Sequence, residues 1–205
     1  MMQKNALIIF VRKPEYGKVK TRLAATLGKT KALKMYELLL QHTHSEAGKT
    51  EAEKFVFYTD ELCTDDIWND YKKFAQRGND LGSRIENAFK NIFDEHYENI
   101  IIIGSDCFEL SNEIIETAFS LLKKNDVVIG PAKDGGYYLL GMKKMYPSIF
   151  ENINWSTSEV FYQTIQKIRS LNLSYELLPV LSDVDTVHDL PEELKNISIP
   201  NYPTL

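Results

Sequence analysis

A carboxylate stands at the end of the most apolar stretch of the chain. Residues 100–103 are four consecutive isoleucines, and Gly104, Ser105 and Asp106 follow them directly. Such a run predicts a strand that is buried on both faces of a sheet. Because ligands of open α/β sheets bind at the carboxyl ends of the strands, Asp106 is placed for chemistry. The alternative is that Ser105 and Asp106 only cap the following helix.

The second candidate is a basic loop, residues 12–22, directly after the first predicted strand. It holds five of the chain's 24 lysines and arginines, and Glu15 is its only acid. In α/β proteins this position gathers phosphate groups, and the forked donors of Arg and the point charge of Lys suit a polyphosphate. The loop matches neither the P-loop nor the Rossmann glycine pattern, and the alternative is a solvated basic turn. The basic residues are Arg12, Lys13, Lys18, Lys20 and Arg22.

A second acidic segment follows the last predicted strand. Asp183 and Asp185 are two residues apart, so an extended backbone would place both on one face. Thr186 and Asp189 are explained by capping of the next helix, whereas Asp183 and Asp185 are not. Mg²⁺ commonly takes one or two protein carboxylates and completes its shell with phosphates and water. Together with Asp106 and the basic loop, this segment predicts a metal–nucleotide site.

A third segment, residues 130–141, has the composition of a substrate loop. Gly135 and Gly136 permit a close approach of backbone to a ligand, and Tyr137 follows them. Asp134 precedes the pair and is a candidate general base for an acceptor hydroxyl, or else a turn residue. A tight hairpin between two strands explains the same glycines equally well.

Composition sets the frame for these candidates. The 205 residues suit one α/β domain spanning 1–205, 43% of them are hydrophobic, and the net charge of −5 argues against nucleic-acid binding. No apolar run approaches the roughly 20 residues that cross a bilayer, so we expect no membrane association. The N-terminus shows no secretion signal, and Cys63 and Cys107 are too few for a disulfide framework, so we expect a cytoplasmic protein.

Strand and helix patterns alternate along the chain, which predicts a mostly parallel sheet flanked by helices. The predicted strands are 6–11, 54–59, 99–104, 126–131, 137–142 and 175–181. The predicted helices are 29–47, 64–75, 81–93, 112–123, 158–171 and 187–196.

The motifs taken together resemble the DUF2064 family, over nearly the whole chain. The matching segments are Lys18–Leu23, Gly104–Cys107, Gly130–Tyr137 and Trp155–Thr157. The family belongs to the nucleotide-diphospho-sugar transferases and is often labelled a glycosyltransferase of arsenosugar biosynthesis. The resemblance implies a GT-A-like fold and a metal carboxylate at the end of a central strand.

Residue by residue, the resemblance implies that Asp106 binds metal in place of a DxD motif. Asp185 is similar to the second metal-binding Asp of related sugar nucleotidyltransferases, and Lys20 and Arg22 resemble the phosphate-binding pair of related guanylyltransferases. The chain departs from the family at Phe108, where the family usually has Pro, which relaxes the backbone beyond Asp106.

Residues 76–82 also match the family's pattern before a helix. Gly78 and Gly82 allow the loop to approach a base or ribose, and Asp80 either contacts the ligand or caps the helix. Arg84 is expected to form a salt bridge on the surface. Trp155 either walls the acceptor pocket or anchors the core.

The leading interpretation is a Mg²⁺- or Mn²⁺-dependent glycosyltransferase that moves a sugar from a nucleotide sugar to a small-molecule acceptor. Asp106 and Asp185 hold the metal, and Asp106, Lys20 and Asp134 form the catalytic set. The alternatives are a nucleotidyltransferase, which takes an NTP and releases pyrophosphate, and a non-catalytic nucleotide-sensing module. The predicted substrate-binding residues are Arg12, Lys18, Arg22, Gly78, Asp80, Gly135, Gly136, Tyr137 and Trp155.

Overall fold

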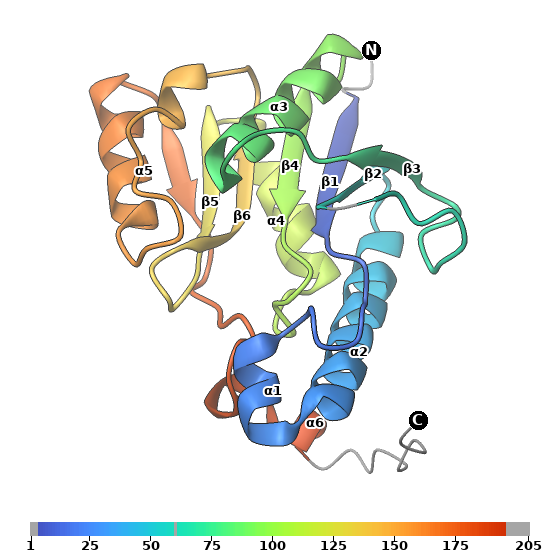
Figure 1. Cartoon of the computed structure of the whole chain (residues 1–205). Helices are drawn as coiled ribbons and strands as arrows, with labels where there is room; N and C mark the ends of the chain where they lie inside the picture. Colours follow the sequence, from blue (N-terminus) through green and yellow to red (C-terminus); the bar gives the residue numbers. More distant parts are fainter. Residues whose placement is uncertain (1–3, 60, 196–205) are drawn as a thin grey trace.

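The computed structural model describes residues 4–59 and 61–195, which fold around one seven-stranded sheet (Figure 1). The strand order is β3-β2-β1-β4-β6-β5-β7, and β6 alone among these strands runs antiparallel to its neighbours. The sheet is therefore mostly parallel, as predicted. The strands are β1 (Asn5–Val11), β2 (Glu53–Tyr58), β3 (Lys72–Ala75), β4 (Asn99–Ile103), β5 (Val127–Pro131), β6 (Tyr137–Met142) and β7 (Tyr175–Leu177).

Helices cover both faces of the sheet (Figure 1). α2 and α4 pack on one face, and α3 and α5 pack on the other. Within the described residues, no helix has both the length and the apolar character that crossing a bilayer requires. The helices are α1 (Thr21–Leu27), α2 (Lys29–Gly48), α3 (Leu81–Asp94), α4 (Asn112–Leu122), α5 (Val160–Ser170) and α6 (Glu192–Lys195), with 3₁₀ turns η1 (Pro147–Ile149) and η2 (Val187–Asp189).

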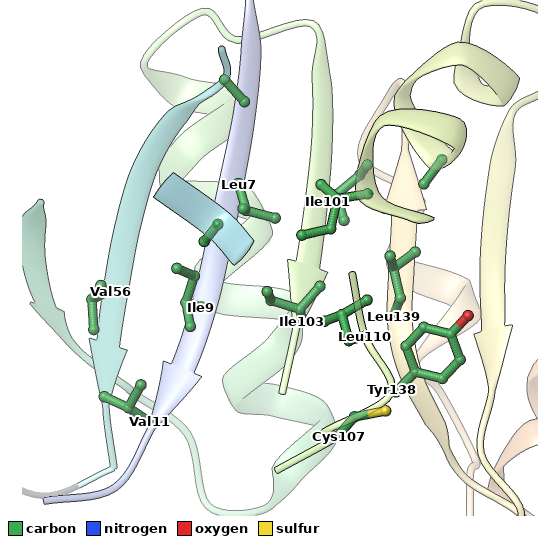
Figure 2. Packing of buried hydrophobic residues seen from close by; sticks show 14 of the residues in the cluster. Leu7, Ile9, Val11, Val56, Ile101, Ile103, Cys107, Leu110, Tyr138 and Leu139 are labelled. Atoms are coloured by element: carbon green, nitrogen blue, oxygen red, sulfur yellow. The ribbon is translucent and has the colours of Figure 1, made fainter. Parts of the chain in front are cut away.

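The central strands are apolar throughout because each face of the sheet has its own core. Along β1, Leu7, Ile9 and Val11 point to the α2 and α4 side, and Figure 2 shows them in line with neighbours from β4 and β6. Ala6 and Ile8 point to the α3 and α5 side. The isoleucine run of β4 is divided in the same way, which explains why the sequence shows a continuous apolar run instead of alternation.

A third apolar cluster lies beyond the carboxyl ends of β1 and β4. It joins Leu23 of α1 and Leu39 of α2 to Val184 and Leu190 of the C-terminal segment. α1 was not predicted: Thr21 and Arg22 were assigned to the basic loop, and no element was assigned between that loop and the helix at residue 29. This cluster holds α1, which directly follows the basic loop, and the C-terminal acidic segment near the carboxyl ends of these strands.

Most predicted elements are present within two residues of their predicted ends, and three differ. β7 ends at Leu177, since Pro179 has no N–H to continue the ladder. The predicted helix 187–196 is divided into η2 and α6 by Pro191, and its residue 196 lies outside the described residues. The predicted helix 64–75 is wrong: the chain bends through residues 61–71 and ends in strand β3.

Tertiary contacts override helical periodicity in that segment. Trp68 is fully buried, and its backbone N–H donates to Asp66 Oδ1 at 3.0 Å. The Asp66 carboxylate also accepts from Tyr58 Oη at 2.5 Å and from Lys73 Nζ at 2.8 Å. These bonds join β2, the bend and β3, so Asp66 is the polar centre of this edge of the sheet.

We predict that Asp66→Ala lowers the free energy of unfolding by about 1–3 kcal/mol, because Tyr58 and Lys73 lose their shared acceptor in a largely buried position. Urea denaturation followed by circular dichroism measures the change. Asp70→Ala, an exposed acid in the same bend, is the matched control and should change stability by less than about 0.5 kcal/mol. Equal effects of the two substitutions would contradict this account.

Candidate active site

A cleft of about 930 Å³ opens at the carboxyl ends of β1 and β4, the edge that the sequence predicted. Its lining includes all three predicted catalytic residues and most predicted binding residues. Gly78 and Gly135 are not among the lining residues; both lie where the backbone packs too closely for a Cβ. The predicted residues that line the cleft are Arg12, Lys18, Lys20, Arg22, Asp80, Asp106, Asp134, Gly136, Tyr137, Trp155 and Asp185.

Lys20 and Asp106 meet at the floor of the cleft. Lys20 Nζ donates to Asp106 Oδ2 at 2.9 Å, and its side chain is only 7% exposed, against 41% for Asp106. The backbone of Lys20 is left-handed, with φ of 45°, immediately before α1 begins at Thr21. An unfavourable conformation at a non-glycine residue is retained where the surroundings fix it, and here it directs Lys20 towards Asp106.

The basic loop makes a second ion pair with the C-terminal segment. Arg22 Nη1 donates to Asp185 Oδ2 at 2.8 Å, and these side chains are 77% and 46% exposed. The start of the loop is held from α2, where Tyr36 Oη accepts from the backbone N–H of Arg12 at 2.9 Å and donates to its carbonyl at 3.1 Å. The loop is therefore fixed from three sides and is not a free basic turn.

The acidic segment is fastened to the end of β4 by one backbone bond. The N–H of Val184 donates to the carbonyl of Asp106 at 2.9 Å, and Val184 is buried in the third apolar cluster. Asp183 and Asp185, on either side of it, both line the cleft. The predicted shared face of these two aspartates is confirmed.

Asp183 is the most perturbed acid of the cleft. Its Oδ1 is buried and has no hydrogen-bond partner among the described residues. Burial, together with the nearby charges of Asp106, Asp134 and Asp185, raises the pKa of the Asp183 carboxyl to about 8, against a smaller lowering by Lys20. The family resemblance implied Asp185 as the second metal ligand and did not single out Asp183, whose burial is not visible in the sequence.

These side chains fit a divalent cation. The charges of three other carboxylates act on Asp183. Two of these carboxylates are paired with cations, Asp106 with Lys20 and Asp185 with Arg22. Excess negative charge and an unpartnered buried oxygen are what an oxygen-preferring cation would satisfy. Within residues 4–59 and 61–195, no three His, Cys, Asp or Glu side chains form a ready-made metal site. Mg²⁺ needs only one or two protein carboxylates when phosphates supply other ligands.

The opposite wall of the cleft is the N-terminal end of α3. Asp80 caps this helix, with its Oδ1 accepting from the Ser83 N–H at 2.7 Å, so capping occupies one of its oxygens. Arg84 does not form the expected surface salt bridge. Its Nε donates to the Gly78 carbonyl at 3.2 Å, it forms no ion pair with a described acid, and it lines the cleft.

Trp155 serves as both wall and anchor. It lines the cleft and stacks on Phe150, with ring centroids 6.4 Å apart, and it meets Tyr137 edge to face at 6.5 Å. Gly82 in α3 is required by this packing, since a Cβ there would lie 2.1 Å from the indole ring. Tyr137 Oη is buried without a hydrogen-bond partner among the described residues, and burial raises its pKa.

Asp134 and the two glycines form the hairpin between β5 and β6. Asp134 Oδ1 accepts from the Gly136 N–H at 2.8 Å, which is the expected turn bond. Gly135 has φ of 92°, and its carbonyl accepts from the Phe161 N–H at 2.9 Å. The hairpin interpretation and the cleft interpretation are therefore compatible, because Asp134 makes the turn and still lines the cleft.

Phe108 and Cys107 take structural positions. Phe108, which stands where the family usually has Pro, packs against His42 with ring centroids 4.6 Å apart. His42 also hydrogen-bonds the Leu110 carbonyl through Nε2 at 2.8 Å. Cys107 is buried, and that burial and nearby Asp183 raise the pKa of its thiol, so it is a packing residue.

Comparisons with known proteins agree with the fold. Residues 41–157 match the family described as "Uncharacterized protein conserved in bacteria (DUF2064)". The chain belongs to the DUF2064 family. A crystal structure of a "putative nucleotide-diphospho-sugar transferase" from Desulfovibrio desulfuricans G20 is 34% identical, with a TM-score of 0.85, over 91% of this chain and 84% of that one. The fold of this DUF2064 protein is the nucleotide-diphospho-sugar transferase fold, and its class is transferase.

More distant structures share the fold with the DUF2064 chain at low identity. The inositol-1-phosphate CTP transferase from T. maritima is 14% identical, with a TM-score of 0.57, over 94% of this chain and 93% of that one. The 4-diphosphocytidyl-2C-methyl-D-erythritol synthase from Anaerococcus prevotii is also 14% identical, with a TM-score of 0.59, over 91% and 92%. No match is found among curated proteins.

We predict that, without metal, Asp183 lowers the stability of the wild-type protein as pH rises from about 4 to about 8. In the unfolded chain this carboxyl ionises near pH 4, whereas the folded chain keeps its proton up to about pH 8, so folding is penalised progressively in that window. Asp183→Asn removes this penalty and should raise the melting temperature at pH 8 in EDTA.

The matched control is Asp94→Asn, which changes an exposed acid at the far end of α3 and should leave the pH dependence as in wild type. Differential scanning fluorimetry from pH 4 to pH 9 measures all three proteins. If Asp183→Asn melts at or below the wild-type temperature at pH 8, the buried carboxyl does not destabilise the fold.

Proposed function

We propose that this DUF2064 protein is a metal-dependent glycosyltransferase that moves a sugar from a nucleotide sugar to a small-molecule acceptor. One observation carries the proposal. The cleft brings the cationic loop after β1 into contact with carboxylates from β4 and the C-terminal segment, through Lys20–Asp106 and Arg22–Asp185. A diphosphate and a divalent cation need these two sets of groups together.

The metal would be Mg²⁺ or Mn²⁺, held by Asp106 and Asp185 with Asp183 beside them. When bound, such a cation neutralises charge that develops on a diphosphate leaving group. Asp183 supports this assignment because its buried Oδ1 has no hydrogen-bond partner among the described residues. A buried carboxylate without a partner destabilises the fold, and binding of a cation would explain why it is there.

The cations of the loop bind the diphosphate. Lys20 is largely buried, so its charge is poorly screened and stabilises a leaving phosphate more than a surface lysine would. Arg22 is exposed and offers a forked donor pair at the rim. Arg12 and Lys18 line the same side and extend the positive surface.

Asp134 and the aromatic wall face the acceptor. In the transfer, the bond between the anomeric carbon and the diphosphate oxygen breaks, and an acceptor hydroxyl oxygen bonds to that carbon. Asp134 takes the hydroxyl proton, since it lines the cleft and only its Oδ1 is engaged in the turn. Trp155 and Tyr137 supply an aromatic surface on which a sugar or acceptor ring packs.

Nucleotidyl transfer is the second candidate. Four cationic side chains, Arg12, Lys18, Lys20 and Arg22, line one side of the cleft, which suits the larger charge of a triphosphate. Two structures of the same fold are named as a CTP transferase and a diphosphocytidyl synthase. In this chemistry the same groups would stabilise departing pyrophosphate.

We predict that one nucleotide sugar raises the melting temperature in the presence of Mn²⁺. A ligand at about 100 times its Kd adds about 2.7 kcal/mol, which is a shift of about 5–10 °C for a protein of this size. The panel contains nucleoside di- and triphosphates and nucleotide sugars, each with and without Mn²⁺. The shift should vanish in Asp106→Asn and persist in Asp94→Asn, which changes an exposed acid at the far end of α3. No shift with any member would refute the metal–nucleotide site.

The reaction products separate the two candidate chemistries. Glycosyl transfer releases a free nucleoside diphosphate, whereas nucleotidyl transfer from an NTP releases pyrophosphate. We expect the nucleoside diphosphate, detected by anion-exchange chromatography after incubation with a nucleotide sugar and pooled small-molecule acceptors. Pyrophosphate release from an NTP would decide for the second candidate, and binding without either product would indicate a nucleotide sensor.

A further inference from the structure

Two of the cations assigned to the phosphates, Lys20 and Arg22, are each bonded to a carboxylate assigned to the metal. Lys20 Nζ lies 2.9 Å from Asp106 Oδ2, and Arg22 Nη1 lies 2.8 Å from Asp185 Oδ2. Both pairs start from the basic loop: one reaches Asp106 after β4, and the other reaches Asp185 in the C-terminal segment. Without a ligand, the phosphate-binding cations Lys20 and Arg22 therefore neutralise the metal-binding carboxylates Asp106 and Asp185.

The two functions of these groups compete. A carboxylate oxygen that accepts from an ammonium or guanidinium group is a poorer ligand for a divalent cation, and the cation is repelled by the charge 3 Å away. A diphosphate offers Lys20 and Arg22 new anionic partners. When they turn to it, the carboxylates regain their full charge.

We propose that Lys20 and Arg22 act as exchangeable counter-ions of the metal carboxylates, so that the divalent cation and the diphosphate bind cooperatively and the cation alone binds weakly. This inference rests on the proposed metal–nucleotide site. It assigns Lys20 a positioning role toward Asp106 in addition to its contact with phosphate. It also gives an order of assembly: the cation enters with the nucleotide and is not stored in the free enzyme.

The two pairs differ in strength. Lys20 is 7% exposed and its direction is fixed by the left-handed backbone before α1, so its pair with Asp106 is weakly screened. Arg22 and Asp185 are 77% and 46% exposed, and exposed pairs contribute little. Lys20 therefore carries most of the competition, and Arg22 adds a small part.

The test measures Mn²⁺ binding without any nucleotide, from the electron paramagnetic resonance signal of free Mn²⁺. Lys20→Met removes the competing charge and should tighten Mn²⁺ binding by about tenfold, whereas Arg22→Met should tighten it by less than about fivefold. Lys13→Met is the matched control: it removes the same charge from the same loop, but its ion pair is with Glu15, so Mn²⁺ affinity should change by less than about twofold. Lys20→Arg should restore weak binding.

The same titration with UDP or GDP present measures the coupling. Cooperativity is reciprocal, so the diphosphate should tighten Mn²⁺ binding in wild type by more than it does in Lys20→Met. A merely structural Lys20 would weaken Mn²⁺ binding when changed, not strengthen it. Lys20→Gln, with its fold checked by circular dichroism, replaces Lys20→Met if that variant does not fold.

Asp106→Asn separates this inference from the proposed function. If Asp106→Asn abolishes Mn²⁺ binding and Lys20→Met leaves it unchanged or weaker, the metal site stands and the counter-ion role is overturned. If neither wild type nor Lys20→Met binds Mn²⁺ in a manner that Asp106→Asn abolishes, with or without the diphosphate, the metal site itself fails. Tighter binding in Lys20→Met that Asp106→Asn abolishes supports both.

Discussion

The site depends on one backbone hydrogen bond, from the N–H of Val184 to the carbonyl of Asp106. It joins a C-terminal segment without regular structure to the end of the central strand β4. Burial of Val184 against α1 and α2 holds that bond in place. Asp183 and Asp185, on either side of Val184, face the cleft. The bond brings Asp183 and Asp185 beside Asp106, which follows β4 in the chain and meets the basic loop through Lys20.

The sequence carried enough information to predict the sheet, because both faces of β1 and β4 are buried and produce apolar runs that no loop would show. It did not predict the bend before β3, where Trp68 is buried by tertiary contacts instead of helical periodicity. The choice of Asp185 as metal ligand rested on the family resemblance, which says nothing of Asp183. The fold distinguishes the two acids, since Asp183 is buried and Asp185 is exposed and paired with Arg22.

Several residues of the cleft hold the fold and line the site at once. Asp80 caps α3, Asp134 closes the β5–β6 hairpin, and Trp155 packs on Phe150, yet all three face the cleft. A rigid wall has a physical advantage for transfer, since side chains that are already ordered lose little entropy when a ligand binds. Asp80 can therefore both cap α3 and face a ligand, and Trp155 can both anchor the core and form the wall.

Charge is distributed differently on the two sides of the cleft. At the floor, Lys20 and Arg22 neutralise acids, while Asp183 remains buried beside like charges and without a hydrogen-bond partner among the described residues. On the far wall, Arg84 forms no ion pair with a described acid and bonds only a backbone carbonyl. The unsatisfied Asp183 lowers the stability of the protein alone, whereas Arg84 acts on Asp80, whose pKa its charge helps to lower. In the proposed complex, a divalent cation would satisfy Asp183, and the diphosphate would give the cations of the cleft anionic partners.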